Sequence, residues 1–234
     1  MIPLSENEVE VRGFHLDSDG DISLELASSL LSADERERAQ AFRFPVHQDR
    51  YIRGRGMVRQ CLAEHLQQDP KTLVFELEDR GKPFLKNNEL YFNLSHSEEK
   101  AALAISRLPS LGIDIEQFDR EVDIPALSRR CFRESEIKRL DGLEGDELQR
   151  AFFWTWTAKE ARMKATGEGF GLEPGKIEIS FDGEWPDRCL APIDPIVYVS
   201  AVRFEGFRAA CTVAATSPFE LRVVPAHLER SETV

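Results

Sequence analysis

The spacing of apolar and polar residues switches along the chain between the period of a helix and the period of a strand. Ser32, followed by Asp34 and Glu35, is typical of a helix N-cap, and the helix is expected to run through the next, arginine-rich segment with a break near Pro45. Apolar residues at helical spacing predict a second helix over residues 49–67. The other expected elements are strands at 72–77, 90–94, 101–106 and 112–116, helices at 124–140 and 147–166, and strands at 177–181, 196–204 and 209–215.

Helices followed by strands therefore occur twice along the chain. This order predicts an α+β protein made of two similar halves that meet near Leu111. The expected division is into residues 1–111 and residues 112–234.

Length and composition narrow the class of protein. The 234 residues, 41% of them hydrophobic, are enough for a core without disulfides, and the four widely spaced cysteines are expected to be reduced. The formal charge of −12 argues against a nucleic-acid binder, because such surfaces need clustered lysine and arginine. The chain shows neither a signal-peptide pattern nor the roughly 20 apolar residues of a membrane helix. We therefore expect a cytoplasmic protein, with no nucleic-acid or membrane partner.

Charge is unevenly distributed over the first 59 residues. Residues 1–35 carry nine acids and one arginine, a net of −8, whereas residues 36–59 carry seven arginines and two acids, a net of +5. Guanidinium groups match the geometry of phosphate, so the cluster suits a small polyanion. A helix face neutralised by local ion pairs explains the charge equally well.

Two carboxylates share one face of the expected strand over residues 112–116. The two-residue period of a strand places Asp114 and Glu116 on one side and Ile113 and Ile115 on the other. If the acidic face is buried, a divalent cation such as Mg²⁺ or Mn²⁺ would relieve the repulsion. An exposed acidic edge strand is the alternative.

A second candidate site lies on the expected helix over residues 147–166. Trp156, Glu160 and Lys164 fall on one stripe of this helix, with Lys159 beside them. A Glu-Lys pair next to a tryptophan suggests a functional pair, although an exposed surface pair beside an aromatic core is the simpler interpretation.

The third candidate is the segment Asn93–Ser97 at the end of a strand. It offers an amide, two hydroxyls, an imidazole and backbone N–H groups that suit phosphate oxygens. A turn-capping role is the alternative for this segment taken alone. A serine nucleophile is not indicated, because adjacent strand residues point to opposite faces and no G-x-S-x-G motif is present.

The order of four motifs is more specific than any one of them. R-G-K-P at 80–83, F-N-L-S-H-S at 92–97, G-I-D-I-E at 112–116 and W-T-A-K-E-A-R-M-K at 156–164 closely resemble the 4′-phosphopantetheinyl transferases of the surfactin-synthetase-activating type. The resemblance covers about residues 32–171. It implies a monomer of two pseudo-symmetric α/β halves with the active site in the cleft between them. The implied activity moves the phosphopantetheine arm of coenzyme A to a serine of an acyl or peptidyl carrier protein and releases 3′,5′-ADP.

The resemblance also implies roles for individual residues. Asp114, Glu116 and Glu160 match magnesium ligands, Glu160 also matches a base for the carrier serine, and Lys164 matches a lysine on the transferred phosphate. The implied coenzyme A contacts are Arg38, which matches a residue on the 3′-phosphate, together with Arg80, Gly81, Lys82, Pro83, Asn93, Leu94, Ser95 and His96. The first half would hold the nucleotide, and the second half would supply the metal ligands and the catalytic helix.

Two positions depart from the family pattern. Arg162 stands where many members have an aromatic residue, and Glu35 stands where some have a lysine near the 3′-phosphate. Two other functions stay open: a non-catalytic coenzyme A or nucleotide binder that uses Arg38, Lys82 and His96, and a metal-dependent phosphohydrolase. For a carrier protein, the arginine-rich segment 36–59 is a candidate docking surface, and we expect charge reversal at Arg53 and Arg55 to test it.

Overall fold

Two antiparallel-rich sheets form the centre of the computed structural model, which describes residues 3–87, 89–167 and 171–225. The first sheet has the order β11-β1-β5-β4, and the second has the order β6-β10-β9-β8-β7. The strands of the first sheet are β1 (Glu8–His15), β4 (Tyr91–Ser97), β5 (Lys100–Ser106) and β11 (Glu220–Pro225). Those of the second are β6 (Leu111–Gln117), β7 (Glu178–Asp182), β8 (Trp185–Ala191), β9 (Tyr198–Val202) and β10 (Ala209–Ala215). The expected α+β class is confirmed.

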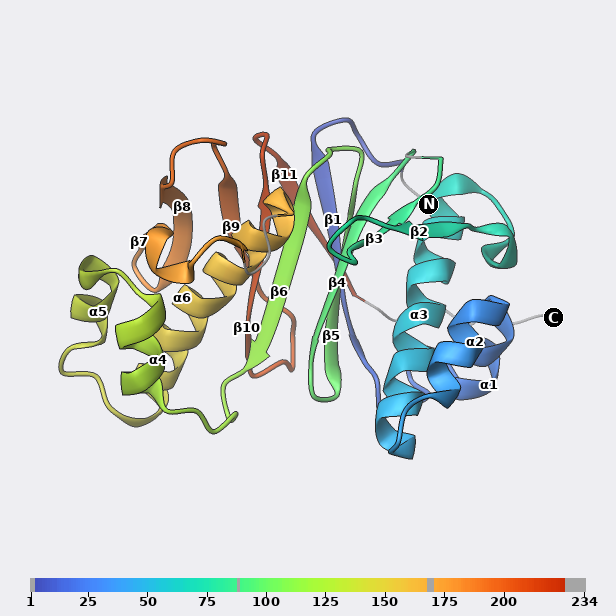
Figure 1. Ribbon diagram of the computed structural model, residues 1–234, viewed down its shortest axis with the longest axis horizontal. Helices are drawn as coiled ribbons and strands as arrows, with labels where there is room; N and C mark the ends of the chain where they lie inside the picture. Colours follow the sequence, from blue (N-terminus) through green and yellow to red (C-terminus); the bar gives the residue numbers. More distant parts are fainter. Residues whose placement is uncertain (1–2, 88, 168–170, 226–234) are drawn as a thin grey trace.

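Helices cover the outer faces of the two sheets, as Figure 1 shows. Next to the first sheet lies α3 (Pro45–Leu66), and α1 (Leu24–Leu30) and α2 (Ala33–Gln40) pack on it. Next to the second sheet lies α6 (Gly145–Thr166), and α4 (Ile124–Cys131) and α5 (Glu134–Leu140) pack on it. A short hairpin of β2 (Phe75–Leu77) and β3 (Pro83–Leu85) follows the 3₁₀ turn Pro70–Thr72, and a second 3₁₀ turn, Pro174–Lys176, precedes β7.

The inner faces of the sheets pack on each other through alternating strand residues. Val9 and Val11 of β1 share one buried cluster with Ile113 and Ile115 of β6. The opposite face of the first sheet packs on α3 through residues such as Phe14. The arrangement is therefore helix, sheet, sheet, helix, and the expected separation of Ile113 and Ile115 from the carboxylate face of β6 is confirmed.

The strand β11 was not expected from the sequence. It pairs in parallel with β1 of the first sheet, although it follows the whole second sheet along the chain. The last strand of the chain thus belongs to the sheet of the first half, so a single boundary at residue 111 does not account for it. The division into residues 1–111 and 112–234 stays a prediction for the rest of the chain. Residues 226–234 lie outside the described residues.

Several helix boundaries differ from the expected ones for local reasons. Pro45 is the first residue of α3 instead of a break within a helix, because the first turn of a helix does not need its N–H. The Ser32 cap is confirmed as a capping box with Glu35. The expected helix over 124–140 is two helices, because the N–H of Arg133 donates to Glu136 Oε2 and starts α5 anew.

Candidate active site

The candidate site lies where the edge strands of the two sheets meet. β4 is the edge strand of the first sheet, β6 is the edge strand of the second, and the two pack side by side (Figure 1). The helix α6 packs on the carboxylate face of β6. Gly112 makes this approach possible, because a Cβ at that position would collide with the backbone of Ala161 and Ala165.

Lys164 is the polar centre of the site. Its Nζ donates to Asp114 Oδ1 at 2.7 Å, to Ser95 Oγ at 3.0 Å and to the carbonyl of Ile113 at 3.1 Å. Ser95 Oγ in turn donates to Asp114 Oδ1 at 2.9 Å. The structure therefore brings together one residue from each of three of the sequence motifs.

The other two acidic residues lie around this centre. Glu116 accepts from Ser97 Oγ at 2.7 Å and from Arg120 Nη1 at 2.6 Å. Burial, followed by the negative charges of Asp114 and Glu116, raises the pKa of Glu160 to about 7, although Lys164 opposes the shift. The three carboxylates are thus close enough to repel one another.

One carboxylate oxygen that lacks a hydrogen-bond partner in the described part of the chain, Asp114 Oδ2, indicates that these carboxylates could bind a magnesium ion. Among the described residues, Asp114 Oδ2 is buried and accepts no hydrogen bond, which is costly for a carboxylate oxygen. Carboxylate oxygens are the ligands that Mg²⁺ prefers, and a cation would also relieve the repulsion at Glu160. Within residues 3–87, 89–167 and 171–225, however, no three acidic, histidine or cysteine side chains already form a metal site. The donor set fits the ion, while Lys164 and Arg120 neutralise two of its members.

Two adjoining cavities lie on the first half. One, of about 300 Å³, is lined by the predicted residues Leu94 and His96. The other, of about 540 Å³, is lined by the predicted residues Arg38, Gly81 and Pro83. Tyr51 and Arg55 line both cavities, so the two are neighbours. Sequence analysis did not single out Tyr51, although it lies one helical turn before Arg55.

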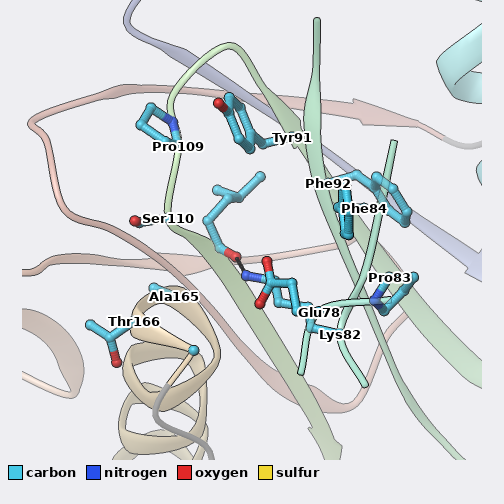
Figure 2. Close-up of a pocket in the computed structure, with 12 residues that line it drawn as sticks. Glu78, Lys82, Pro83, Phe84, Tyr91, Phe92, Pro109, Ser110, Ala165 and Thr166 are labelled. Atoms are coloured by element: carbon cyan, nitrogen blue, oxygen red, sulfur yellow. Dashed lines mark hydrogen bonds between the residues drawn. The ribbon is translucent and has the colours of Figure 1, made fainter. Parts of the chain in front are cut away.

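Figure 2 shows a third cavity, of about 240 Å³, beneath the β2–β3 hairpin. Lys82 and Glu78 reach it from the hairpin, and Ala165 and Thr166 from the end of α6. Lys82 Nζ donates to the carbonyls of Leu111 at 2.8 Å and Lys164 at 2.9 Å. This lysine therefore joins the hairpin to β6 and to α6. Arg80, from the same motif, donates to the carbonyl of Gly167.

Most of the arginine cluster is bound within the protein. Arg50 pairs with Asp17 and Glu98, and Arg53 pairs with Asp19. Arg55 and Arg59 both pair with Glu35 at 2.6 Å. Glu35, which departs from the family pattern, therefore acts in this chain as the ion-pair partner of two arginines. The acidic block of residues 1–35 thus supplies three of the partners, and the ion-pair interpretation accounts for most of the cluster.

The docking surface on residues 36–59 stays a prediction, but Arg53 and Arg55 are unsuitable positions for testing it. Arg53 is buried, and it donates to the carbonyl of Leu16 as well as to Asp19. Arg55 is held by Glu35 beneath the ring of Phe75. Reversing either charge would break an ion pair that holds a buried or half-buried arginine, so a change in carrier binding could not be assigned to docking.

The last motif contains two residues whose positions the sequence did not predict. Lys159 is 1% exposed, and its Nζ pairs with Glu136 at 2.6 Å while donating to the carbonyls of Cys131, Pro174 and Ile177. Arg162 is fully buried and donates to Thr166 Oγ1. Both side chains point into the second half and hold α6 there, while Glu160 and Lys164 are coupled to the carboxylates of β6.

Comparisons with known proteins find matches along most of the chain. Residues 110–212 match the model of the 4′-phosphopantetheinyl transferase superfamily, and residues 20–107 match that of the 4′-phosphopantetheinyl transferase N-terminal region. The 4′-phosphopantetheinyl transferase HetI of Nostoc sp. is 35% identical over 88% of this chain and 91% of its own length. The transferase gsp of Aneurinibacillus migulanus is 29% identical over 83% of this chain and 82% of its own. The transferase Sfp of Bacillus subtilis is 28% identical over 67% of this chain and 70% of its own length.

One solved structure also matches part of the chain. It is a holo-(acyl-carrier-protein) synthase from Bacillus anthracis in complex with CoA (3′,5′-ADP), 27% identical, with a TM-score of 0.39. The match covers 44% of this chain and 91% of that one. No helix in the described part of this chain is both long enough and apolar enough to cross a membrane. The relative that is 35% identical over most of both chains shows that this protein belongs to the 4′-phosphopantetheinyl transferase superfamily.

Proposed function

We propose that this protein transfers the 4′-phosphopantetheine group of coenzyme A to a serine of an apo acyl or peptidyl carrier protein. One observation carries the proposal: Lys164, Asp114 and Ser95 meet at the seam between the two sheets, with Glu160 and Glu116 around them. A lysine beside carboxylates, in a chain of this family, suits transfer of a charged phosphoryl group. The adjoining cavities supply space for the nucleotide.

The nucleotide would lie on the first half. The larger cavity combines the guanidinium of Arg38 with the glycine and proline of the β2–β3 turn. Arg38 stacks over Tyr51 at 5.9 Å and forms no ion pair with the described residues, so it can receive the 3′-phosphate. His96 lines the adjoining cavity and lies near enough to Lys164 for the charge of the lysine to help lower the pKa of the histidine, after the effect of burial.

The proposed step is a displacement at phosphorus. The hydroxyl oxygen of the carrier serine attacks the phosphorus that bears the pantetheine arm and forms a new O–P bond. The bond from that phosphorus to the bridging oxygen breaks, so that 3′,5′-ADP leaves with this oxygen. The serine proton passes to Glu160, and Lys164 neutralises charge on the transferred phosphate.

Asp114, Glu116 and Glu160 would hold the magnesium ion. When bound, the ion would neutralise pyrophosphate charge. Ser95 and Ser97 orient two of these carboxylates by donating hydrogen bonds to them. We also propose that the chain acts as a monomer in the cytoplasm, with residues 1–111 holding the nucleotide and residues 112–234 supplying the acidic residues and α6.

The decisive experiment combines the protein with coenzyme A, Mg²⁺ and a panel of apo carrier proteins. We expect each accepted carrier to gain the mass of one phosphopantetheine arm, with release of an equal amount of 3′,5′-ADP. Asp114→Ala should abolish transfer, and Asp182→Ala, which changes an exposed aspartate at the end of β7, serves as the matched control. Near-normal transfer by Asp114→Ala would refute the metal role of Asp114.

The same assay separates the two other functions. A non-catalytic binder would retain coenzyme A without changing any carrier. A phosphohydrolase would release phosphopantetheine to water when no carrier is present. Either result, across the whole panel, would overturn the proposed transfer.

A further inference from the structure

The seam between β4 and β6 is joined by side chains. The two strands are the edges of different sheets, yet they run side by side. Backbone groups on the edge of a strand need partners when they are buried, and a neighbouring strand normally supplies them. In β6, several backbone N–H and C=O groups instead form hydrogen bonds with side chains of neighbouring elements.

Asn93 is the first of these side chains. Its Oδ1 accepts a hydrogen bond of 2.8 Å from the backbone N–H of Ile113, and the residue is only 8% exposed. The bond reaches the residue directly before Asp114. Asn93 thus uses its amide oxygen to hold β6, while the residues on either side of it, Phe92 and Leu94, pack in the core of the first half.

A second attachment lies at the other end of the site. Ser97 Oγ accepts from the backbone N–H of Gln117 at 3.2 Å, and Gln117 Nε2 donates to the carbonyl of Ser97 at 2.9 Å. Lys100 Nζ completes the set by donating to Gln117 Oε1 at 2.8 Å. Asn93 and Ser97 each bond the backbone of the residue twenty positions later, so the two attachments define one register.

The reacting groups lie between these two attachments. Ser95 occupies the middle position on the same face of β4, and it bonds the side chain of Asp114 instead of the backbone. A shift of β6 along β4 would move Asp114 away from Ser95. Lys164 would shift together with Asp114, because α6 packs on β6. The register of the seam therefore fixes the positions of the acidic residues and of the lysine relative to the first half.

We propose that Asn93, with the Ser97–Gln117 pair, is a positioning residue that sets the register of β6 against β4. This inference rests on the proposed transfer function, and it replaces a direct coenzyme contact as the role of Asn93. A positioning residue acts on the rate of the chemical step, whereas a coenzyme contact acts on binding.

Kinetics of Asn93→Ala separate the two roles. We expect kcat to fall by at least about tenfold, with a change in KM for coenzyme A of no more than about threefold, because the acidic residues are displaced while the nucleotide cavities are retained. Asn87→Ala, which changes an exposed asparagine after β3, is the matched control and should behave as the wild type. A raised KM with kcat retained would overturn the proposal and favour a coenzyme contact.

Hydrogen exchange at the amide of Ile113 tests the same inference without activity. In the unliganded wild type this amide should exchange slowly, and Asn93→Ala should speed its exchange by about tenfold or more. Asn93→Asp keeps an acceptor and should preserve most of the protection. Unchanged protection in Asn93→Ala would overturn the inference whether or not transfer is observed.

The second attachment keeps the inference testable if Asn93→Ala does not fold. In Ser97→Ala the amide of Gln117 should lose protection, and in Ser97→Thr, which keeps the hydroxyl, protection should return. Equal protection in both variants would contradict the proposed register. An inactive wild type with the expected exchange pattern would instead refute the transfer function and leave the seam assignment intact.

Discussion

The two long helices α3 and α6 are equal in length but differ in what their charged residues do. Each has 22 residues and lies on the outer face of a sheet. The arginines of α3 pair with nearby acidic residues such as Asp17, Asp19 and Glu35. On α6, Lys159 is bound inside the second half, whereas Lys164 reaches the edge strand β6.

The difference comes from the neighbour of each helix. The helix α3 packs largely on α1 and α2, and its arginines are neutralised by Glu35 of α2 and by acidic residues of loops, such as Asp17 and Asp19. The helix α6 packs on β6 and β10, and β6 is an edge strand that presents two carboxylates. The neighbours of α3 and α6, and not the number of charged residues on each helix, therefore decide what their charged side chains bind.

The largest expected effect is on the buried pair that anchors α6. Lys159→Met would leave Glu136 buried without its cation and should reduce the free energy of unfolding by about 3–5 kcal/mol. Arg59→Met on α3 should cost less, about 1.5–3 kcal/mol, because Glu35 keeps Arg55 as a partner. Denaturant unfolding of both variants measures the difference.

The double variant Lys159→Met/Glu136→Gln is the control for this comparison. The amide oxygen that replaces the Glu136 carboxylate could still accept from the backbone N–H of Arg133 or of Ile179, so part of the lost stability should return. If Arg59→Met were the more destabilising single variant, the anchoring role given to Lys159 would be contradicted.

The second expected effect is on transfer by Lys164→Met. Removal of the ammonium should reduce kcat/KM by about 10²–10³, because a preorganised charge next to the reacting phosphate is lost. Lys138→Met, on the exposed face of α5, should leave the rate unchanged. A loss of less than threefold in Lys164→Met would show that this lysine does not contact the transferred group.

The motifs of α6 and β6 could be predicted because their spacing carries the chemistry. The strand period placed Asp114 and Glu116 together, and the helical period placed Glu160 with Lys164. Both periods are local properties of the sequence, so they survive folding unchanged. These short patterns predicted which residues lie together, whereas the roles of the residues were implied only by the resemblance of the four ordered motifs to the family.

Features that depend on distant parts of the chain could not be predicted in this way. β1 does alternate apolar and polar residues, which offered a signal, but its pairing with β11 joins residues about 210 positions apart. The burial of Lys159 and Arg53 depends on carbonyls and acidic residues from other elements. The role of Asn93 likewise emerges only once β4 and β6 are placed together.

The third expected effect is a loss of stability in acid, and it arises from Glu10 on β1 of the first sheet. Burial alone would raise the pKa of Glu10, but its contacts with His65 and Arg12 lower it from 4.5 to about 2. A lowered pKa means that the carboxylate stabilises the fold above pH 4.5, and this stability, roughly 3 kcal/mol, is lost as the pH falls from 4.5 towards 2. Glu10 also binds Arg222 of β11, so this loss would loosen the returning strand.

Glu10→Gln measures that contribution directly. The variant should be less stable than the wild type at pH 7, and the two should converge as the pH approaches 2. Unfolding free energies measured across this range test the sign. A difference that stays constant with pH would show that folding does not lower the pKa of Glu10.

The smallest expected effect compares one glycine beside each long helix. A methyl group at Gly112 would collide with the backbone of α6, so Gly112→Ala should cost about 1–3 kcal/mol of stability and displace Glu160 and Lys164 from β6. In Gly54→Ala on α3 the methyl group would meet Leu94 at 3.5 Å, which is an ordinary contact. Because alanine also favours the helix, Gly54→Ala should keep or raise the melting temperature. Equal losses in both variants would mean that the close approach of α6 to β6 is not what distinguishes the two helices.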